Sequence, residues 1–292
     1  MADQKNLPKK PDSPNKVVLL LDTTSLMPMA DVQPALGAFI NLLQPGDQFA
    51  ILGYKARVAH VYPPKSLATY KDRQVLTDAT LALDALTEAG TRSNLTAALN
   101  VSSALLDPTD PPKAIVLVDA RPWNAGTDPL LSLPDFPVET IAIGDNGQTQ
   151  TLQAIAEKTG GTYNFAAEPS ALINIMLEIV ERLGIALIVA TGSRKVSNRQ
   201  SYNLVGRVVE GTQTATFLVF WEDPEITYGG GPRSVTAEIL DPTQKPINIA
   251  PAWAGDGFAV FSIPAPAPGS WSLSSTYVGP GTCTFTNAIL IA

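Results

Sequence analysis

Two short apolar runs, each closed by an aspartate, decide the fold: residues 17–22 read VVLLLD and residues 114–119 read AIVLVD. Neither run alternates polar and apolar residues, so each predicts a strand buried on both faces, as in a parallel sheet. Helical periodicity follows the first run, over residues 31–43, and precedes the second, over residues 72–86 and 94–106. Strands that alternate with helices predict a doubly wound, mostly parallel α/β sheet of the Rossmann-like kind.

The rest of this half continues the alternation. Residues 48–54 and 57–62 predict two strands, and the short gap between them favours an antiparallel pair at a sheet edge. Gly160-Gly161 and Gly184 each follow a helical pattern and predict its C-terminal end. The remaining predicted elements are strands over residues 138–143 and 162–165 and helices over residues 151–159 and 169–183.

The composition changes after Gly184, where Gly, Pro, Ser and Thr become dense and helical periodicity fades. Short strands separated by turn residues predict an all-β sandwich of the immunoglobulin or fibronectin type III kind. The predicted strands are residues 185–190, 203–209, 214–221, 234–240, 247–250, 257–263, 271–278 and 284–291. We therefore predict a disordered leader over residues 1–15, an α/β domain over residues 16–184 and a sandwich over residues 185–292.

Composition and charge exclude several classes of protein. The net charge is −7, and an acidic surface repels phosphate backbones, so nucleic acid is not an expected partner. No stretch reaches the roughly 18–20 apolar residues of a membrane span. The first residues, MADQKNLPKK, lack the apolar run of a secretory signal. Cys283 is the only cysteine, so the chain forms no internal disulfide.

The aspartates that close the two apolar runs are the candidate functional residues. In an open parallel sheet, ligands bind beyond the carboxyl ends of the strands, so Asp22 and Asp119 are expected at one crevice. Two neighbouring carboxylates repel unless a cation or a proton lies between them, and hard divalent cations prefer carboxylate and hydroxyl oxygens. Thr24 and Ser93 offer such hydroxyls, although Ser93 stands where a helix N-cap is equally expected.

At these residues the chain resembles the von Willebrand factor A family. The resemblance runs from about residue 16 to residue 184 and includes VVLLLDTTSLM, SNLTAAL, KAIVLVD, VETIAIGD and LQAIAEKTGGTYNFA. It implies a metal-ion-dependent adhesion site, in which an Asp-x-Ser-x-Ser motif, a loop threonine and a later aspartate hold a magnesium ion. An acidic residue of a partner protein fills the ion's open coordination position.

The match to that motif is partial. Asp22 and Asp119 fit the two aspartates, and Thr24 and Ser93 fit two hydroxyl positions with conservative changes. Leu26 stands at the second hydroxyl position and cannot coordinate an ion, and Ala120 replaces the usual glycine. The change at Leu26 is expected to weaken Mg²⁺ binding or to give that place to water.

The second half resembles the β-sandwich that follows the A-type domain in calcium-activated chloride channel regulator proteins. The resemblance rests on a strand ending in Trp221, an L-D-P turn at residues 240–242, and the P-G-x-W sequence that ends at Trp271. Those proteins also carry a zinc protease segment, but this chain has no HExxH motif, so proteolysis is not expected here.

Two functions remain open at this stage. The first is a protein-recognition or cell-adhesion module, which contacts its partner through Asp22, Thr24, Ser25, Ser93 and Asp119. The second is a structural subunit of a larger assembly, with self-association and a non-functional metal site. An enzyme is not expected, because His60, the only histidine, stands in an edge-strand pattern and no catalytic triad can be built around it. The family resemblance allows an extracellular or cell-surface location.

Overall fold

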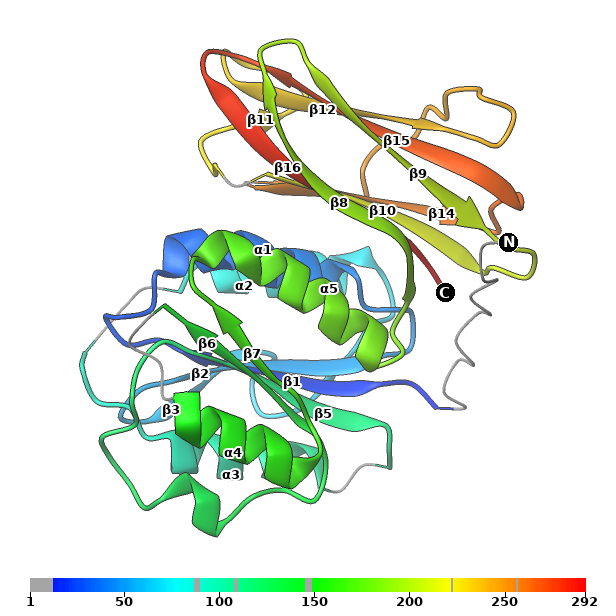
Figure 1. The fold of residues 1–292 in the computed structure, drawn as a ribbon. Helices are drawn as coiled ribbons and strands as arrows, with labels where there is room; N and C mark the ends of the chain where they lie inside the picture. Colours follow the sequence, from blue (N-terminus) through cyan, green and yellow to red (C-terminus); the bar gives the residue numbers. More distant parts are fainter. Residues whose placement is uncertain (1–12, 87–89, 108–109, 145–148, 222, 256) are drawn as a thin grey trace. The chain divides into compact units, whose positions relative to one another are not determined.

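A computed structural model describes residues 13–86, 90–107, 110–144, 149–221, 223–255 and 257–292 (Figure 1). Residues 1–12, most of the predicted disordered leader, lie outside the described residues. The chain forms two compact units. One consists of Pro45–Ile175 and the described residues before Pro34, and the other of Pro34–Gln44 and Met176–Ala292. The predicted boundary at residue 184 stays a prediction.

The first unit is built on a mixed, mostly parallel sheet with the strand order β3-β2-β1-β5-β6-β7. Strands β1, β2, β5, β6 and β7 run parallel, and β3 and β4 pair antiparallel with β2. This confirms the predicted parallel sheet and its antiparallel edge pair, whereas the two-residue β4 was not predicted. The bounds are β1 Lys16–Asp22, β2 Gln48–Tyr54, β3 Val58–Tyr62, β4 Ala68–Thr69, β5 Lys113–Asp119, β6 Val138–Ile143 and β7 Tyr163–Ala166.

Helices accompany the strands in the predicted alternation. They are α1 Met29–Asn41, α2 Arg73–Asp84, α3 Leu95–Leu106, α4 Thr149–Thr159 and α5 Leu172–Arg182, with short 3-10 turns η1 Pro129–Leu131 and η2 Pro169–Ala171. In Figure 1, α3 and α4 cover one face of the sheet, and α2 lies on the opposite face. Buried side chains of β1, β2 and β5 pack with those of α3 and α4 into one apolar core.

The helix ends have local chemical causes. Asp72 caps α2 by accepting hydrogen bonds from the backbone N–H groups of Gln74 and Val75, and Asn94 caps α3 by accepting one from Ala97 N–H. Helix α4 ends before Gly160, which has a φ of +78°, a conformation that favours glycine. The predicted stop at this glycine is confirmed.

The second unit contains two further sheets. One has the order β13-β14-β10-β16-β8, and the other has the order β11-β12-β15-β9. Neighbouring strands are antiparallel except for the short pair of β11 and β12. The bounds are β8 Leu187–Ser197, β9 Ser201–Val208, β10 Thr214–Trp221, β11 Thr227–Tyr228, β12 Ser234–Leu240, β13 Trp253–Gly255, β14 Phe258–Pro264, β15 Gly269–Val278 and β16 Thr282–Ile291.

Two sequence expectations for these sheets have clear outcomes. The predicted strand over residues 247–250 is wrong, because the segment is irregular between Pro246 and Pro251, which lack the N–H donors of a strand ladder. The predicted last strand, over residues 284–291, is confirmed as β16. It pairs with β10 on one side and β8 on the other, so it is an internal strand of its sheet.

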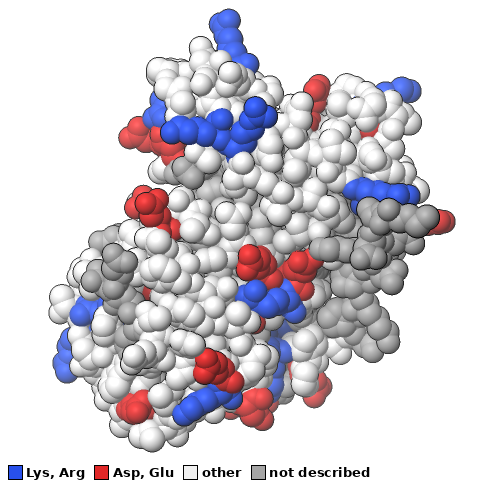
Figure 2. Space-filling view, in the orientation of Figure 1, with Lys and Arg blue, Asp and Glu red and all other residues white. Residues whose placement is uncertain are grey.

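Charged side chains of both signs are interspersed over the face seen in Figure 2, and broad areas between them carry neither sign. Within the described part of the chain, no helix is long and apolar enough to cross a lipid bilayer.

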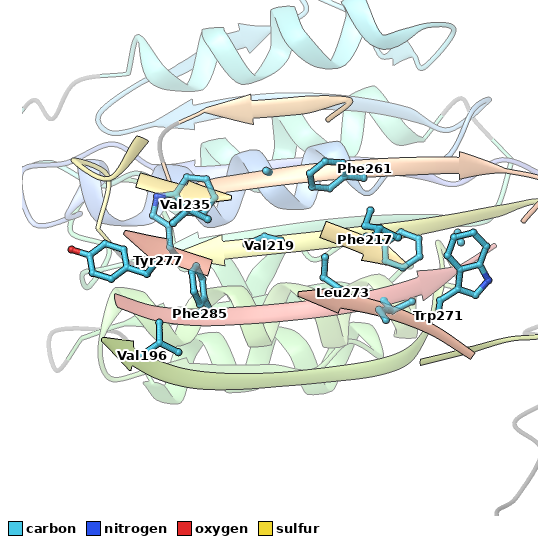
Figure 3. Close-up of a cluster of buried hydrophobic side chains, with 14 of the residues drawn as sticks. Val196, Phe217, Val219, Val235, Phe261, Trp271, Leu273, Tyr277 and Phe285 are labelled. Atoms are coloured by element: carbon cyan, nitrogen blue, oxygen red, sulfur yellow. The ribbon is translucent and has the colours of Figure 1, made fainter. Parts of the chain in front are cut away.

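The core of the second unit lies between its two sheets (Figure 3). Phe217, Val219 and Phe285 from the first sheet pack with Val235 and Leu273 from the second, and all five side chains are fully buried. Apolar faces that meet in this way make the unit a β-sandwich. Trp271 lies at the start of β15, as expected, and fills one end of this core while its ring N–H donates to Ala267 C=O at 2.9 Å.

Candidate functional site

Three adjacent strands bring polar side chains to one level at the carboxyl edge of the α/β sheet. Asp22 ends β1, Tyr54 ends β2 and Asp119 ends β5. Asp22 pairs with Tyr54 in the register of β1 and β2, and Leu21 pairs with Val118 in the register of β1 and β5. Because strand side chains alternate between faces, all three side chains share the face covered by α3 and α4. Each of the three residues is completely buried.

Thr24 holds the Asp22 carboxylate in place. Its backbone N–H donates to Asp22 Oδ1 at 2.8 Å, and its side-chain hydroxyl donates to Asp22 Oδ2 at 2.9 Å. A longer contact of 3.5 Å joins Ala120 N–H to Asp22 Oδ2. Burial nevertheless raises the pKa of Asp22, and the hydrogen bonds from Thr24 only oppose this rise.

The Asp119 carboxylate accepts fewer hydrogen bonds than the Asp22 carboxylate. Its Oδ1 accepts a hydrogen bond from Arg121 N–H at 3.2 Å, whereas its buried Oδ2 has no hydrogen-bond partner. Burial, followed by the negative charge of Asp22, raises the pKa of Asp119 well above its usual range. The ion pairs of the described residues involve neither carboxyl. A charge on both groups is therefore unfavourable unless a cation or a proton lies between them.

Ser93 reaches the site from the loop before α3. Its N–H donates to Asn124 Oδ1 at 2.8 Å, and its C=O accepts from Asn124 N–H at 3.0 Å and Ala125 N–H at 3.1 Å. The side-chain Oγ of Ser93 is buried and has no hydrogen-bond partner. The helix N-cap is Asn94, so the alternative role of Ser93 as the cap is wrong. The Ser93 hydroxyl is left available to a ligand.

Two residues of this site escaped the sequence analysis. Tyr54 places its hydroxyl in the same buried region, where it interacts with Asp119 and Ser93, although no described residue forms a well-aligned hydrogen bond with it. Burial, followed by the charges of Asp119 and Asp22, raises the pKa of Tyr54 well above 10.0. Asn124 fixes the loop that carries Ser93. The alternation of β2 could have revealed Tyr54, but Asn124 lies in a loop, where no periodicity indicates direction.

The loop after β1 forms the exposed border of the site. Ser25 and Leu26 are exposed, with Leu26 retaining 47% of its accessible surface, whereas Thr24 is fully buried. Ser25 N–H donates to Gly90 C=O at 3.0 Å, which ties this loop to the segment before Ser93. The four predicted ligands Asp22, Thr24, Ser93 and Asp119 thus lie in the buried part, and Ser25 lies on the exposed border.

The chemistry of these groups is that of a small oxygen-donor site. It combines two carboxylates with hydroxyl groups, and the unpartnered Ser93 Oγ and Asp119 Oδ2 fit a hard divalent cation. The described residues hold no cluster of three or more His, Cys, Asp or Glu side chains suited to a metal ion. A cation here would therefore depend on the hydroxyl groups. His60 is exposed on β3, away from the ends of β1 and β5.

The family comparison agrees with the α/β fold predicted from the sequence. A family model of the von Willebrand factor type A domain matches residues 15–165. The chain belongs to the von Willebrand factor type A (VWA) domain family. VWA domains are commonly protein-interaction modules and are generally non-catalytic.

Solved structures share the fold of this VWA protein. A von Willebrand factor type A protein from Catenulispora acidiphila is 17% identical, with a TM-score of 0.55 over 92% of this chain and 59% of that chain. The VWA protein thus spans less than two thirds of that structure's length. The ArnB paralog VWA2 from Sulfolobus acidocaldarius is 14% identical, with a TM-score of 0.45 over 92% of this chain and 58% of that chain.

A third structure is proximal thread matrix protein 1 from the mussel byssus, with zinc in its metal-ion-dependent adhesion site (MIDAS) motif. It is 14% identical, with a TM-score of 0.49 over 64% of this chain and 50% of that chain. At 17% identity, the likeness to the Catenulispora acidiphila structure shows the fold alone. No curated protein matches the chain.

Proposed function

We propose that this VWA protein is a non-catalytic protein-recognition module that uses a divalent cation, Mg²⁺, at the carboxyl edge of its α/β sheet. Asp22, Thr24, Ser93 and Asp119 would hold the ion. The ion would supply a positively charged coordination position for an acidic group of the partner. Ser25, exposed beside Thr24, would add a polar contact to the same partner surface.

One observation supports this proposal above all: two fully buried carboxyl groups end adjacent strands, and neither forms an ion pair with a basic side chain of the described residues. Burying a charge without a counter-charge is unfavourable, and two like charges make it worse. A divalent cation removes both penalties at once. The hydroxyl groups of Thr24 and Ser93 supply the neutral oxygens that Mg²⁺ accepts beside carboxylates, and water fills the remaining places.

A second function is favoured by a different observation. Leu26 is exposed at the motif position where the family places a hydroxyl ligand. In this alternative the metal site is non-functional, and the domain is a structural subunit that associates with itself or with a larger assembly. The buried carboxyls would then share a proton instead of a cation.

We further propose that the sandwich is of the immunoglobulin or fibronectin type III kind, related to that of the calcium-activated chloride channel regulator proteins. Its two mainly antiparallel sheets and the buried Trp221 and Trp271 support this assignment. The sandwich would act as a spacer or as a second contact surface.

The proposed function predicts that Mg²⁺ stabilises the protein and that Asp22→Ala abolishes this effect. A ligand present at a hundredfold excess over its Kd stabilises the native state by about 2.7 kcal/mol. Thermal unfolding of the wild-type protein in Mg²⁺ and in a chelator measures the shift. Asp22→Ala should show none, because it removes a carboxylate ligand.

Asp135→Ala is the matched control, since Asp135 is an exposed loop aspartate. It should keep the full Mg²⁺ response. A wild-type melting temperature that ignores both Mg²⁺ and the chelator would reject the cation-dependent function. If light scattering then showed concentration-dependent oligomers, the structural alternative would stand in its place.

A further inference from the structure

The hydroxyl of Tyr54 is a polar group that neither the family motif nor the apolar core accounts for. Tyr54 is completely buried, and no described residue forms a well-aligned hydrogen bond with its hydroxyl. A buried hydroxyl without a well-aligned hydrogen bond is unfavourable, so a position of this kind favours a role in binding or in orienting a neighbouring group. Tyr163, a half-buried residue of β7, also has a buried hydroxyl for which no described residue is a hydrogen-bond partner.

Strand order directs the Tyr54 hydroxyl toward Asp119. Strands β2 and β5 flank β1, so about two strand spacings, roughly 10 Å, separate their backbones. The Tyr54 phenol from β2 and the Asp119 carboxyl from β5 share one face of the sheet, and each group shifts the pKa of the other through a direct interaction. The charge of Asp119 acts on the Tyr54 hydroxyl more strongly than that of its register partner Asp22, which agrees with this direction.

One carboxylate oxygen of Asp119 can accept a further hydrogen bond. Its Oδ1 accepts from Arg121 N–H, and its Oδ2 accepts from no donor. Asp22, by contrast, has both oxygens engaged by Thr24. Of the two carboxylates, Asp119 is therefore the one with an oxygen free to accept from a further side-chain donor, and the Tyr54 hydroxyl is the neighbouring side-chain group that lowers its pKa against the rise caused by burial.

We propose that Tyr54 is a positioning residue of the cation site: its hydroxyl donates a hydrogen bond to Asp119 and keeps that carboxylate turned toward the ion. This inference rests on the proposed function. It assigns to β2 a role that compensates for the ligand missing at Leu26, because a well-oriented carboxylate binds a cation more tightly than one free to rotate. Partners of this kind commonly change metal affinity by about 10- to 100-fold.

The test compares the wild type with Tyr54→Phe and Tyr163→Phe in titrations with Mg²⁺ and Mn²⁺. Each substitution removes one buried hydroxyl and keeps the aromatic ring. Tyr54→Phe should weaken cation binding by about tenfold or more, the range expected of a group that orients a metal ligand. Tyr163→Phe should bind as the wild type does.

Two further readouts separate positioning from a purely structural role. In the absence of cation, Tyr54→Phe should melt close to the wild-type temperature, because the buried ring and its packing are kept and only the hydroxyl contact with Asp119 is removed. Addition of Mg²⁺ should also produce a near-ultraviolet tyrosine difference band in the wild type and in Tyr163→Phe, and none in Tyr54→Phe.

The outcomes distinguish the two proposals. Equal cation affinity in Tyr54→Phe and the wild type, or a difference band that survives in Tyr54→Phe, would overturn the role of Tyr54 and leave the cation site intact. A wild-type protein that binds neither Mg²⁺ nor Mn²⁺ would reject the proposed function, and the role of Tyr54 with it.

Discussion

Leu26 is the residue that separates the two proposed functions. It stands at a hydroxyl position of the family motif, and its side chain is 47% exposed, so little packing depends on it. A serine here should therefore be tolerated and would restore the missing oxygen. The residue thus allows a gain-of-function experiment, which is more informative than removing a ligand.

We expect Leu26→Ser to raise the affinity for Mg²⁺ by about tenfold, which corresponds to about 1.4 kcal/mol. The physical reason is that a neutral oxygen ligand replaces a carbon side chain at the ion. Isothermal titration of wild type and variant measures the change. Leu26→Ala is the control, because it shortens the side chain without adding an oxygen, and equal affinities in the two variants would contradict a ligand role for position 26.

At the residue scale, the sequence predicted the site residues that end apolar strands or match the family motif. Asp22 and Asp119 end apolar strands, so their meeting at one sheet edge could be predicted from strand order. Tyr54 was missed because an aromatic residue at the end of an apolar strand is usually core, although strand alternation places it on the same face as the two aspartates. Asn124 depends on the path of a loop, which hydrophobic periodicity does not encode.

At the scale of elements, predictions succeeded where burial and capping agreed. The runs at β1, β5 and β6 are apolar because both faces of the sheet are covered, and their bounds were found to within one residue. The strand predicted over residues 247–250 is absent. The prediction followed the short apolar alternation of the segment and gave too little weight to the flanking Pro246 and Pro251. The two-residue strands β4 and β11 are too short to leave a pattern.

Gly161 shows how a single element junction depends on close backbone approach. A Cβ atom at this position would lie 2.1 Å from the backbone oxygen of Val138 on β6. Gly161→Ala should therefore force α4 and the start of β7 away from β6 and lower the free energy of unfolding by about 1–3 kcal/mol, as overpacking does. Chemical denaturation measures this change in the free energy of unfolding.

The matched control for this substitution is Gly230→Ala, since a Cβ there meets nothing within 4 Å. Gly230→Ala should leave the free energy of unfolding nearly unchanged. If Gly161→Ala were as stable as this control, the predicted clash with the Val138 backbone would be contradicted, because the backbone would have moved without loss of stability.

At the scale of the whole molecule, the candidate site is the property of one compact unit. Asp22, Tyr54, Ser93, Asp119 and Asn124 all belong to the unit built on the α/β sheet. The sandwich has its own core, made by side chains of its two sheets. Cation binding and sandwich stability should therefore respond to different substitutions.

Leu273→Ala tests this separation. Leu273 is fully buried in the sandwich core on β15, and loss of such a side chain lowers the free energy of unfolding by about 2–5 kcal/mol. Calorimetry should detect this loss, while titration of the folded variant should give the wild-type affinity for Mg²⁺, because Leu273 and the site residues belong to different compact units. An affinity that fell together with sandwich stability would mean that the sandwich takes part in forming the site, and the assignment of recognition to the α/β unit alone would have to be abandoned.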